Sequence, residues 1–115
     1  MIRFLTNEVQ NSDNFIHVYQ CDSDNELANA VSQVMVGRGY KLKEGTIVNG
    51  VYEKGDRTMR LLFGAFVKYF KFTINVTNMK VTLNSGTSGF SGGVIGIGQV
   101  RKEAGEIAEV LMTLQ

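Results

Sequence analysis

Residues 15–27, FIHVYQCDSDNEL, decide the fold, because a strand pattern and a helix start meet within them. The run FIHVYQC at 15–21 is rich in β-branched and aromatic residues, which is typical of a β-strand. SDNE at 23–26 follows with the S-x-x-E form of a capping box. In this motif the hydroxyl of Ser23 and the carboxylate of Glu26 each accept a backbone N–H at the start of a helix. The sequence therefore predicts a strand that is followed at once by a helix.

The helix that begins at this capping box is predicted to run over about 23–37. Behind the cap, a single apolar stripe recurs at intervals of three and four residues, as on one face of an α-helix. The stripe consists of Leu27, Ala30, Val31, Val34 and Met35. Gly37 and Gly39 then offer the left-handed conformation that commonly ends a helix.

Alternating apolar and polar residues predict a series of strands after this helix. Glycines divide residues 39–57 into short strands near 40–44 and 46–53, joined by tight turns. Residues 57–65 fit either a strand or a helix, and we prefer the strand. A last strand is predicted over Lys80–Leu83.

The strand predicted over 66–76 has the cleanest alternation. One face carries Phe66, Phe70, Phe72, Ile74 and Val76. The opposite face carries Tyr69, Lys71, Thr73 and Asn75. Because successive side chains of a strand point to opposite faces, we expect the aromatic face in the core and the other face in water.

The end of the chain predicts a second, long helix. Its apolar residues recur every three or four positions: Val94, Ile97, Val100, Ala104, Ile107, Leu111 and Leu114. At about 100° per residue, Gly89, Gly92, Gly93 and Gly96 project onto the same face as this stripe. Each interior glycine destabilises a helix by roughly 0.5–1 kcal/mol relative to alanine. We therefore expect these glycines to permit very close packing on the sheet or to leave room for a ligand.

The bulk composition indicates one ordinary globular domain over residues 1–115. The 115 residues are 43% hydrophobic and 20% charged, which provides one core and excludes a disordered chain. The formal net charge of +1 creates no strong field for nucleic acid or an anionic membrane, and it is compatible with a homodimer. Without a signal-peptide pattern, a cytoplasmic location is expected. For residues 1–13 we leave open whether they are ordered or disordered.

The stretch GFSGG at 89–93 fits the G-x-S-x-G pattern of a nucleophile elbow, which makes Ser91 a candidate nucleophile. In α/β-hydrolases an acid and then a histidine follow that serine, whereas the one histidine here, His17, precedes it. Ser91 is explained more simply as the N-cap of the second helix. A small serine hydrolase that uses Ser91 is the alternative function.

Other motifs point to no cofactor, metal or nucleic acid. A lone Cys21 and a lone His17 do not supply the ligand spacing of a metal site. KYFKF at 68–72 interleaves basic and aromatic residues as RNA-binding sheets do, but its alternation places the phenylalanines in the core. Glu103 and Glu106 follow the surface of a helix and are interpreted as solvated carboxylates.

The predicted elements define an α+β domain. It consists of a single antiparallel sheet of about five strands with two helices packed on one face, in the order β-α-β-β-β-β-α. This order is similar to that of TATA-binding-protein-like and helix-grip domains, a similarity of architecture that implies no residue roles.

The function we expect is a non-catalytic binding or interaction domain. A small hydrophobic ligand or a protein partner would lie between the C-terminal helix and the sheet. The residues predicted to line this groove are Phe66, Phe70, Phe72, Gly92, Gly93 and Gly96.

Overall fold

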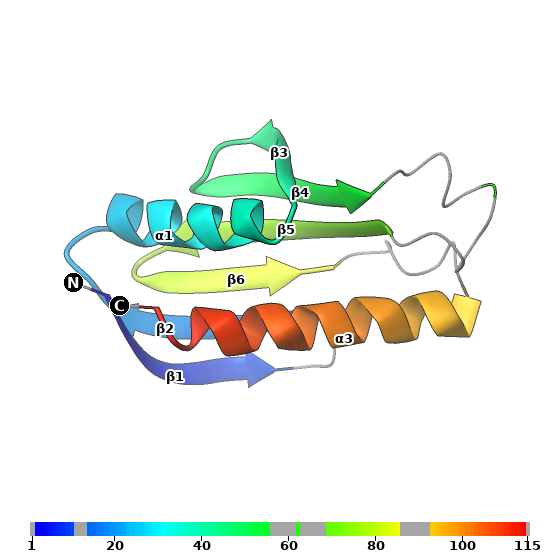
Figure 1. The fold of residues 1–115 in the computed structure, drawn as a ribbon. Helices are drawn as coiled ribbons and strands as arrows, with labels where there is room; N and C mark the ends of the chain where they lie inside the picture. Colours follow the sequence, from blue (N-terminus) through cyan, green and yellow to red (C-terminus); the bar gives the residue numbers. More distant parts are fainter. Residues whose placement is uncertain (1, 11–13, 56–61, 63–68, 86–92, 115) are drawn as a thin grey trace.

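The structure is a computed structural model that describes residues 2–10, 14–55, 62, 69–85 and 93–114. These residues form one antiparallel sheet of six strands in the order β1-β2-β6-β5-β4-β3. Helices α1 and α3 lie over the same face of the sheet (Figure 1). The elements in chain order are β1 (Arg3–Gln10), β2 (Asn14–Gln20), α1 (Asp24–Gly37), β3 (Lys41–Gly45), β4 (Asn49–Gly55), β5 (Tyr69–Thr77), β6 (Lys80–Asn84) and α3 (Gly93–Leu111).

The α+β class and the single antiparallel sheet are confirmed, but the predicted strand count is too low by one. The additional strand is β1, which pairs with β2 at one edge of the sheet. The observed order is therefore β-β-α-β-β-β-β-α. Of the segment 57–65, the described residue is Leu62, which is helical and exposed, so the preference for a strand fails at that position.

The predicted start of α1 is confirmed by the cap. The Oγ of Ser23 accepts a hydrogen bond from the backbone N–H of Glu26 at 3.1 Å. The next residue, Asp24, accepts hydrogen bonds from the backbone N–H groups of Asn78 at 3.0 Å and Met79 at 2.7 Å. Asn78 and Met79 form the β5–β6 turn with φ of 53° and 60°, the left-handed pair that a two-residue hairpin requires. Methionine rarely adopts this conformation, and Asp24 holds it in place.

The β3–β4 hairpin depends on glycine at two positions. Gly45 has φ of +77°, and a Cβ there would overlap the carbonyl oxygen of Asn49. Gly50 lies within β4 rather than at a turn, and a Cβ there would overlap the carbonyl oxygen of Thr46 and the side chain of Leu42. Glycine at both positions thus permits the close approach of the two strands.

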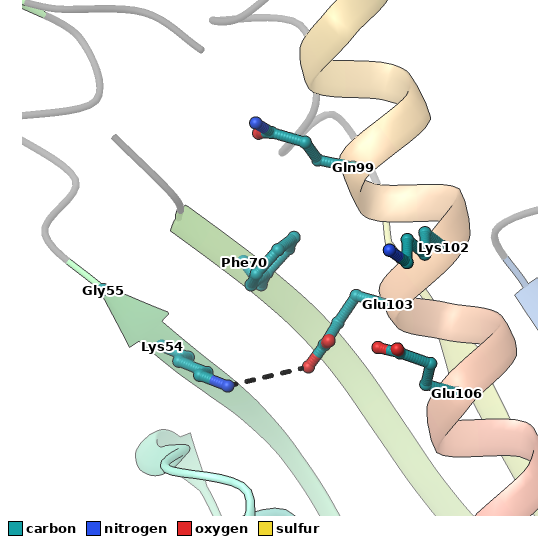
Figure 2. A pocket seen from close by; sticks show the side chains of 7 residues that line it. All are labelled: Lys54, Gly55, Phe70, Gln99, Lys102, Glu103 and Glu106. Carbon is teal, nitrogen blue, oxygen red and sulfur yellow. Dashed lines mark ion pairs between the residues drawn. The ribbon is translucent and has the colours of Figure 1, made fainter. Parts of the chain in front are cut away.

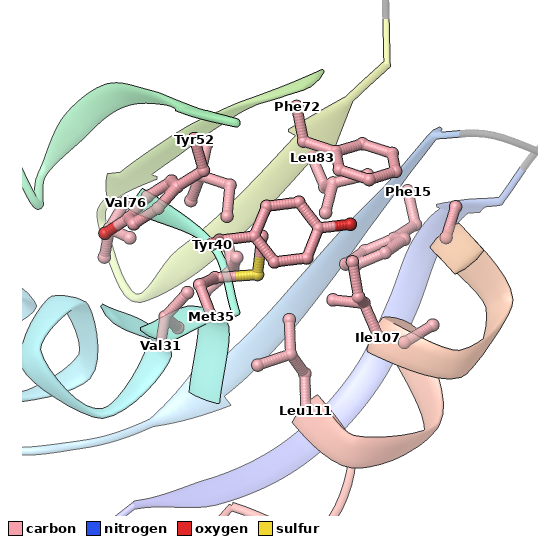
Figure 3. Close-up of a cluster of buried hydrophobic side chains, with 14 of the residues drawn as sticks. Phe15, Val31, Met35, Tyr40, Tyr52, Phe72, Val76, Leu83, Ile107 and Leu111 are labelled. Carbon is pink, nitrogen blue, oxygen red and sulfur yellow. The ribbon is translucent and has the colours of Figure 1, made fainter. Parts of the chain in front are cut away.

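The core lies between the sheet and the two helices (Figure 3). The alternation predicted for β5 is confirmed for its inward face, where Phe70, Phe72, Ile74 and Val76 are buried. The stripe of α3 is confirmed for Val100, Ala104, Ile107 and Leu111, which are also buried. Tyr69 was expected on the solvent face of the sheet, but it is 4% exposed and therefore buried. In the described segments, neither helix has an apolar stretch long enough to cross a lipid bilayer.

Candidate functional site

A pocket of about 250 Å³ opens between α3 and the ends of β4 and β5 (Figure 2). Its described lining consists of Lys54, Gly55, Phe70, Gln99, Lys102, Glu103 and Glu106. The groove predicted from the sequence would also lie between the C-terminal helix and the sheet, and of its six predicted residues the described lining includes Phe70.

The lining residues are brought together by regular helix and strand spacing. On α3, residues 99, 102, 103 and 106 are separated by three, one and three positions, so they share one face of the helix. On the sheet, Lys54 of β4 is the cross-strand partner of Phe70 of β5, so both side chains point toward α3. Helix α3 therefore forms one wall of the pocket, and the paired strands β4 and β5 form the opposite wall.

Glu103 forms a nearly buried carboxylate at one wall, with 6% of its surface exposed. Its Oε1 accepts a hydrogen bond from Nη2 of Arg38 at 2.9 Å, and its Oε2 accepts one from the hydroxyl of Tyr40 at 2.8 Å. The Nζ of Lys54 lies 4.0 Å from the same Oε2. A second carboxylate, Glu106, accepts a hydrogen bond from Arg38 at 3.2 Å. The C-terminal end of α1 is thus tied to α3 through Arg38.

The environment of Glu103 keeps it ionised. Burial raises the pKa of a carboxyl group, but the hydrogen bonds from Tyr40 and Arg38 and the charges of Arg38 and Lys54 outweigh burial, so the pKa of Glu103 is lowered. Burial, together with the neighbouring carboxylate, raises the pKa of Tyr40 above its ordinary value. At neutral pH this cluster therefore consists of a carboxylate and a protonated tyrosine that donates to it.

Two lysines contribute ammonium groups to the pocket. The Nζ of Lys54 lies 5.6 Å from the centre of the Tyr40 ring, within the range of a cation–π contact. Lys102 is exposed, and no described residue forms an ion pair with it. Lys54, Lys102 and the ring of Phe70 therefore surround the pocket, as Figure 2 shows.

The six residues predicted to line the groove are only partly placed at this pocket. Phe70 lines it, whereas Phe72 is wholly buried in the core and does not. Phe72 lies deeper because it sits two residues further along β5 on the same inward face, beneath the two helices. Gly93 and Gly96 belong to α3, and Phe66 and Gly92 lie outside the described residues.

The sequence interpretation missed the charged residues of the pocket. We assigned Glu103 to the helix surface, but it lies three residues after Val100 and four before Ile107, within the buried stripe. That spacing is the signal that could have identified it as a buried carboxylate. Glu106, also assigned to the helix surface, forms an ion pair with Arg38 at 3.2 Å.

The described residues do not test the hydrolase alternative. Ser91 lies outside the described residues. His17 is wholly buried, its Nδ1 lies 3.3 Å from the hydroxyl of Tyr19, and burial lowers its pKa to about 4. His17 is therefore a core residue. Within the described residues, no group of three or more histidine, cysteine, aspartate and glutamate side chains is placed to hold a metal ion.

Comparisons with known proteins give no relative: neither the models of protein families, nor characterised proteins, nor solved structures match this chain. The chemistry of the pocket is therefore the basis on which its function is inferred.

Proposed function

We propose that this protein is a non-catalytic binding domain that holds a small molecule in the pocket between α3 and the ends of β4 and β5. The observation that carries the proposal is the buried Glu103 cluster at the wall of an open pocket. Buried charge in a small domain requires a compensating network, and here that network fixes the side chains that face the pocket.

The pocket wall is organised before any ligand arrives. Because Glu103 is held by donors on both oxygens, its position does not depend on a ligand. Its partners come from the end of α1 and the residue before β3, and the opposite wall comes from the β4–β5 pair. A site held by several rigid elements loses little conformational entropy on binding, which favours recognition.

The lining supports binding rather than catalysis. Among its described residues there is no serine, cysteine or histidine, the side chains that most often serve as nucleophile or general base. Its one buried carboxylate is already engaged by Arg38 and Tyr40. A non-catalytic role accounts for these features.

Native mass spectrometry of the purified full chain tests the proposal. We expect extra mass that disappears when the protein is denatured, and the same spectrum reports whether the protein is a homodimer. Gln99→Trp places a large ring in the pocket and is expected to abolish the extra mass. Glu109→Trp, at an exposed position of the same helix, is the matched control and should retain it.

A bare wild-type mass calls for a second measurement before a conclusion is drawn. The backbone amide resonances of residues 99–106 are recorded while a library of small fragments is added. If the wild-type mass is bare and no fragment shifts these resonances, the protein does not bind small molecules at this pocket, and the proposal is wrong.

A further inference from the structure

From the charges that line the pocket, we infer that its ligand is a small amphipathic anion: an apolar, one- or two-ring body that carries one carboxylate. This inference rests on the proposed function, because it names the chemical class of the molecule that the pocket takes. It goes beyond the hydrophobic ligand that the sequence predicted.

The carboxylates of the pocket do not attract a cation, because both are already paired. Glu103 accepts from Arg38 on one oxygen and from Tyr40 on the other. Glu106 accepts from the same Arg38 at 3.2 Å. A guanidinium that bridges two carboxylates neutralises much of their field, and a tyrosine hydroxyl satisfies a further lone pair. A cationic ligand would have to displace these contacts.

The ammonium groups of the pocket are, in contrast, less fully engaged. Lys54 forms a long ion pair with Glu103 at 4.0 Å, and its side chain is 38% exposed, so its Nζ can also contact a ligand. Lys102 is exposed and has no ion-pair partner among the described residues. With Arg38 included, three cations face two carboxylates, which leaves an excess positive charge for an anionic ligand.

The apolar part of the ligand would lie near Phe70, whose ring lines the pocket between the two lysines (Figure 2). The volume of about 250 Å³ lies just below the roughly 300–1,000 Å³ of pockets that hold drug-sized molecules. It therefore accommodates a compact ring system with a short polar group. A carboxylate at the mouth would contact Lys102 and Lys54 while the ring is removed from water.

A matched series of three probes tests the charge preference: 2-naphthoate, 2-naphthalenemethanol and 2-naphthylmethylammonium. They share one aromatic body and differ in charge, so the ratio of their affinities isolates the electrostatic contribution. Dissociation constants are measured by amide chemical-shift titration of the full chain at neutral pH and low salt. We expect naphthoate to bind roughly tenfold more tightly than the alcohol, and the ammonium to bind most weakly.

Variants of the two lysines test whether these side chains produce the preference for the anionic probe. Lys102→Met and the double variant Lys54→Met/Lys102→Met are expected to lower the ratio of naphthoate to alcohol affinity toward one, while alcohol binding is retained. Lys71→Met, on the opposite face of β5, is the control and should leave the ratio unchanged. If a variant does not fold, the salt dependence of the wild type serves instead: added NaCl should weaken naphthoate binding and not alcohol binding.

The outcomes separate this inference from the proposed function. If the alcohol or the ammonium binds as tightly as naphthoate, the anion preference is wrong but the pocket still binds small molecules. If the ratio is unaffected by the lysine variants, the anion is held elsewhere and the inference is also wrong. If none of the probes shifts residues 99–106, both the inference and the proposed function are contradicted.

Discussion

Two tyrosine hydroxyls reach α3 from different parts of the molecule, and each is the centre of a buried polar cluster of a different kind. Tyr19 of β2 donates to the backbone carbonyl of Leu111 at 2.6 Å, beside the buried ring of His17. Tyr40, just before β3, donates to the carboxylate of Glu103 beside Arg38. The first cluster, which we call the Tyr19 cluster, carries no charge, whereas the second, the Tyr40 cluster, is ionic.

The Tyr19 cluster is neutral by necessity. A tyrosine hydroxyl has one hydrogen, and Tyr19 gives it to Leu111, so its oxygen accepts from His17 and the proton of that imidazole lies on Nδ1. The remaining Nε2 is buried without a described hydrogen-bond partner. The rings of Phe4 and Phe15 lie with their centres 5.0 Å and 4.2 Å from that of His17. An imidazolium in these surroundings would lack a counter-charge.

The Tyr40 cluster tolerates charge because it lies at the edge of the core. The side chains of Arg38 and Lys54 are 25% and 38% exposed, and they bring opposite charge to the buried Glu103. The pocket opens beside this cluster and not beside the Tyr19 cluster. The difference indicates that the neutral cluster fastens the end of α3 to the sheet, whereas the ionic cluster also lines the pocket.

The largest effect is expected from Glu103→Ala. Removing this carboxylate leaves the Tyr40 hydroxyl without an acceptor and Arg38 with one fewer partner, and breaking such a buried pair typically costs about 3–5 kcal/mol. The free energy of unfolding, measured by chemical denaturation at pH 7, should fall by about that amount. The exposed Glu109→Ala provides the control, with a change within about 0.5 kcal/mol. Equal stability of the two variants would contradict a structural role for the ionic cluster.

The next effect is the pH dependence that the Tyr19 cluster produces. Burial lowers the pKa of His17 from its ordinary value of 6.5 to about 4, so the unfolded chain binds this proton more tightly than the folded one. The free energy of unfolding is therefore expected to decrease as the pH falls from 6.5 to 4, by up to about 3 kcal/mol. Denaturation curves across this range should show the decrease in the wild type and lose it in His17→Phe. Parallel pH profiles for the two proteins would rule out the buried neutral histidine.

The ionic cluster is expected to change the free energy of unfolding in a lower pH range than the Tyr19 cluster, so the two clusters can be distinguished by pH. The pKa of Glu103 lies below its ordinary value of 4.5, so the stabilisation from its ionised form is complete above pH 4.5 and is lost as the pH falls further. Glu103→Gln should therefore flatten the profile only below pH 4.5, whereas His17→Phe flattens it above pH 4. If both variants altered the same window, the two clusters would not be independent.

These clusters also mark the limit of what the sequence could predict. The capping box at Ser23 and the inward face of β5 depend on neighbouring residues, and both were predicted correctly. The strand β1 was not, because register shifts on both sides of Thr6 and Asn7 break its alternation: Phe4 and Asn7, three residues apart, both pair with inward-facing residues of β2.

For the candidate site, the sequence predicted a groove between the last helix and the sheet, and Phe70 is the residue of that prediction that lines the described pocket. The spacing of the last helix also contained the signal for a buried Glu103. The contact between Arg38 and Glu103 joins residues 65 positions apart, and no local pattern encodes such a pair. The ionic character of the pocket was missed for this reason.

A smaller effect is expected from Tyr19→Phe, which removes one hydroxyl from the neutral cluster. The carbonyl of Leu111 keeps only the longer hydrogen bond from the backbone N–H of Leu114 at 3.3 Å, and the Nδ1–H of His17 loses its acceptor. Leaving a buried polar group unpaired costs about 1–3 kcal/mol. Thermal and chemical denaturation at pH 7 should show a loss in this range with an unchanged far-UV circular dichroism spectrum. A variant as stable as the wild type would show that this hydroxyl does not fasten α3.

The smallest effect is expected from Arg38→Met, which keeps most of the side-chain volume but removes the guanidinium from the ionic cluster. Because the Arg38 side chain is 25% exposed, water replaces part of the lost interaction, and a decrease of about 1 kcal/mol in the free energy of unfolding is expected.

The same substitution leaves Glu106 unpaired at the pocket, so 2-naphthoate binding should weaken by several-fold while 2-naphthalenemethanol binding is retained. An increase in naphthoate affinity would mean that Arg38 does not neutralise the two carboxylates. A loss of stability as large as that of Glu103→Ala would mean that the ionic cluster depends on Arg38 rather than on the hydrogen bond from Tyr40.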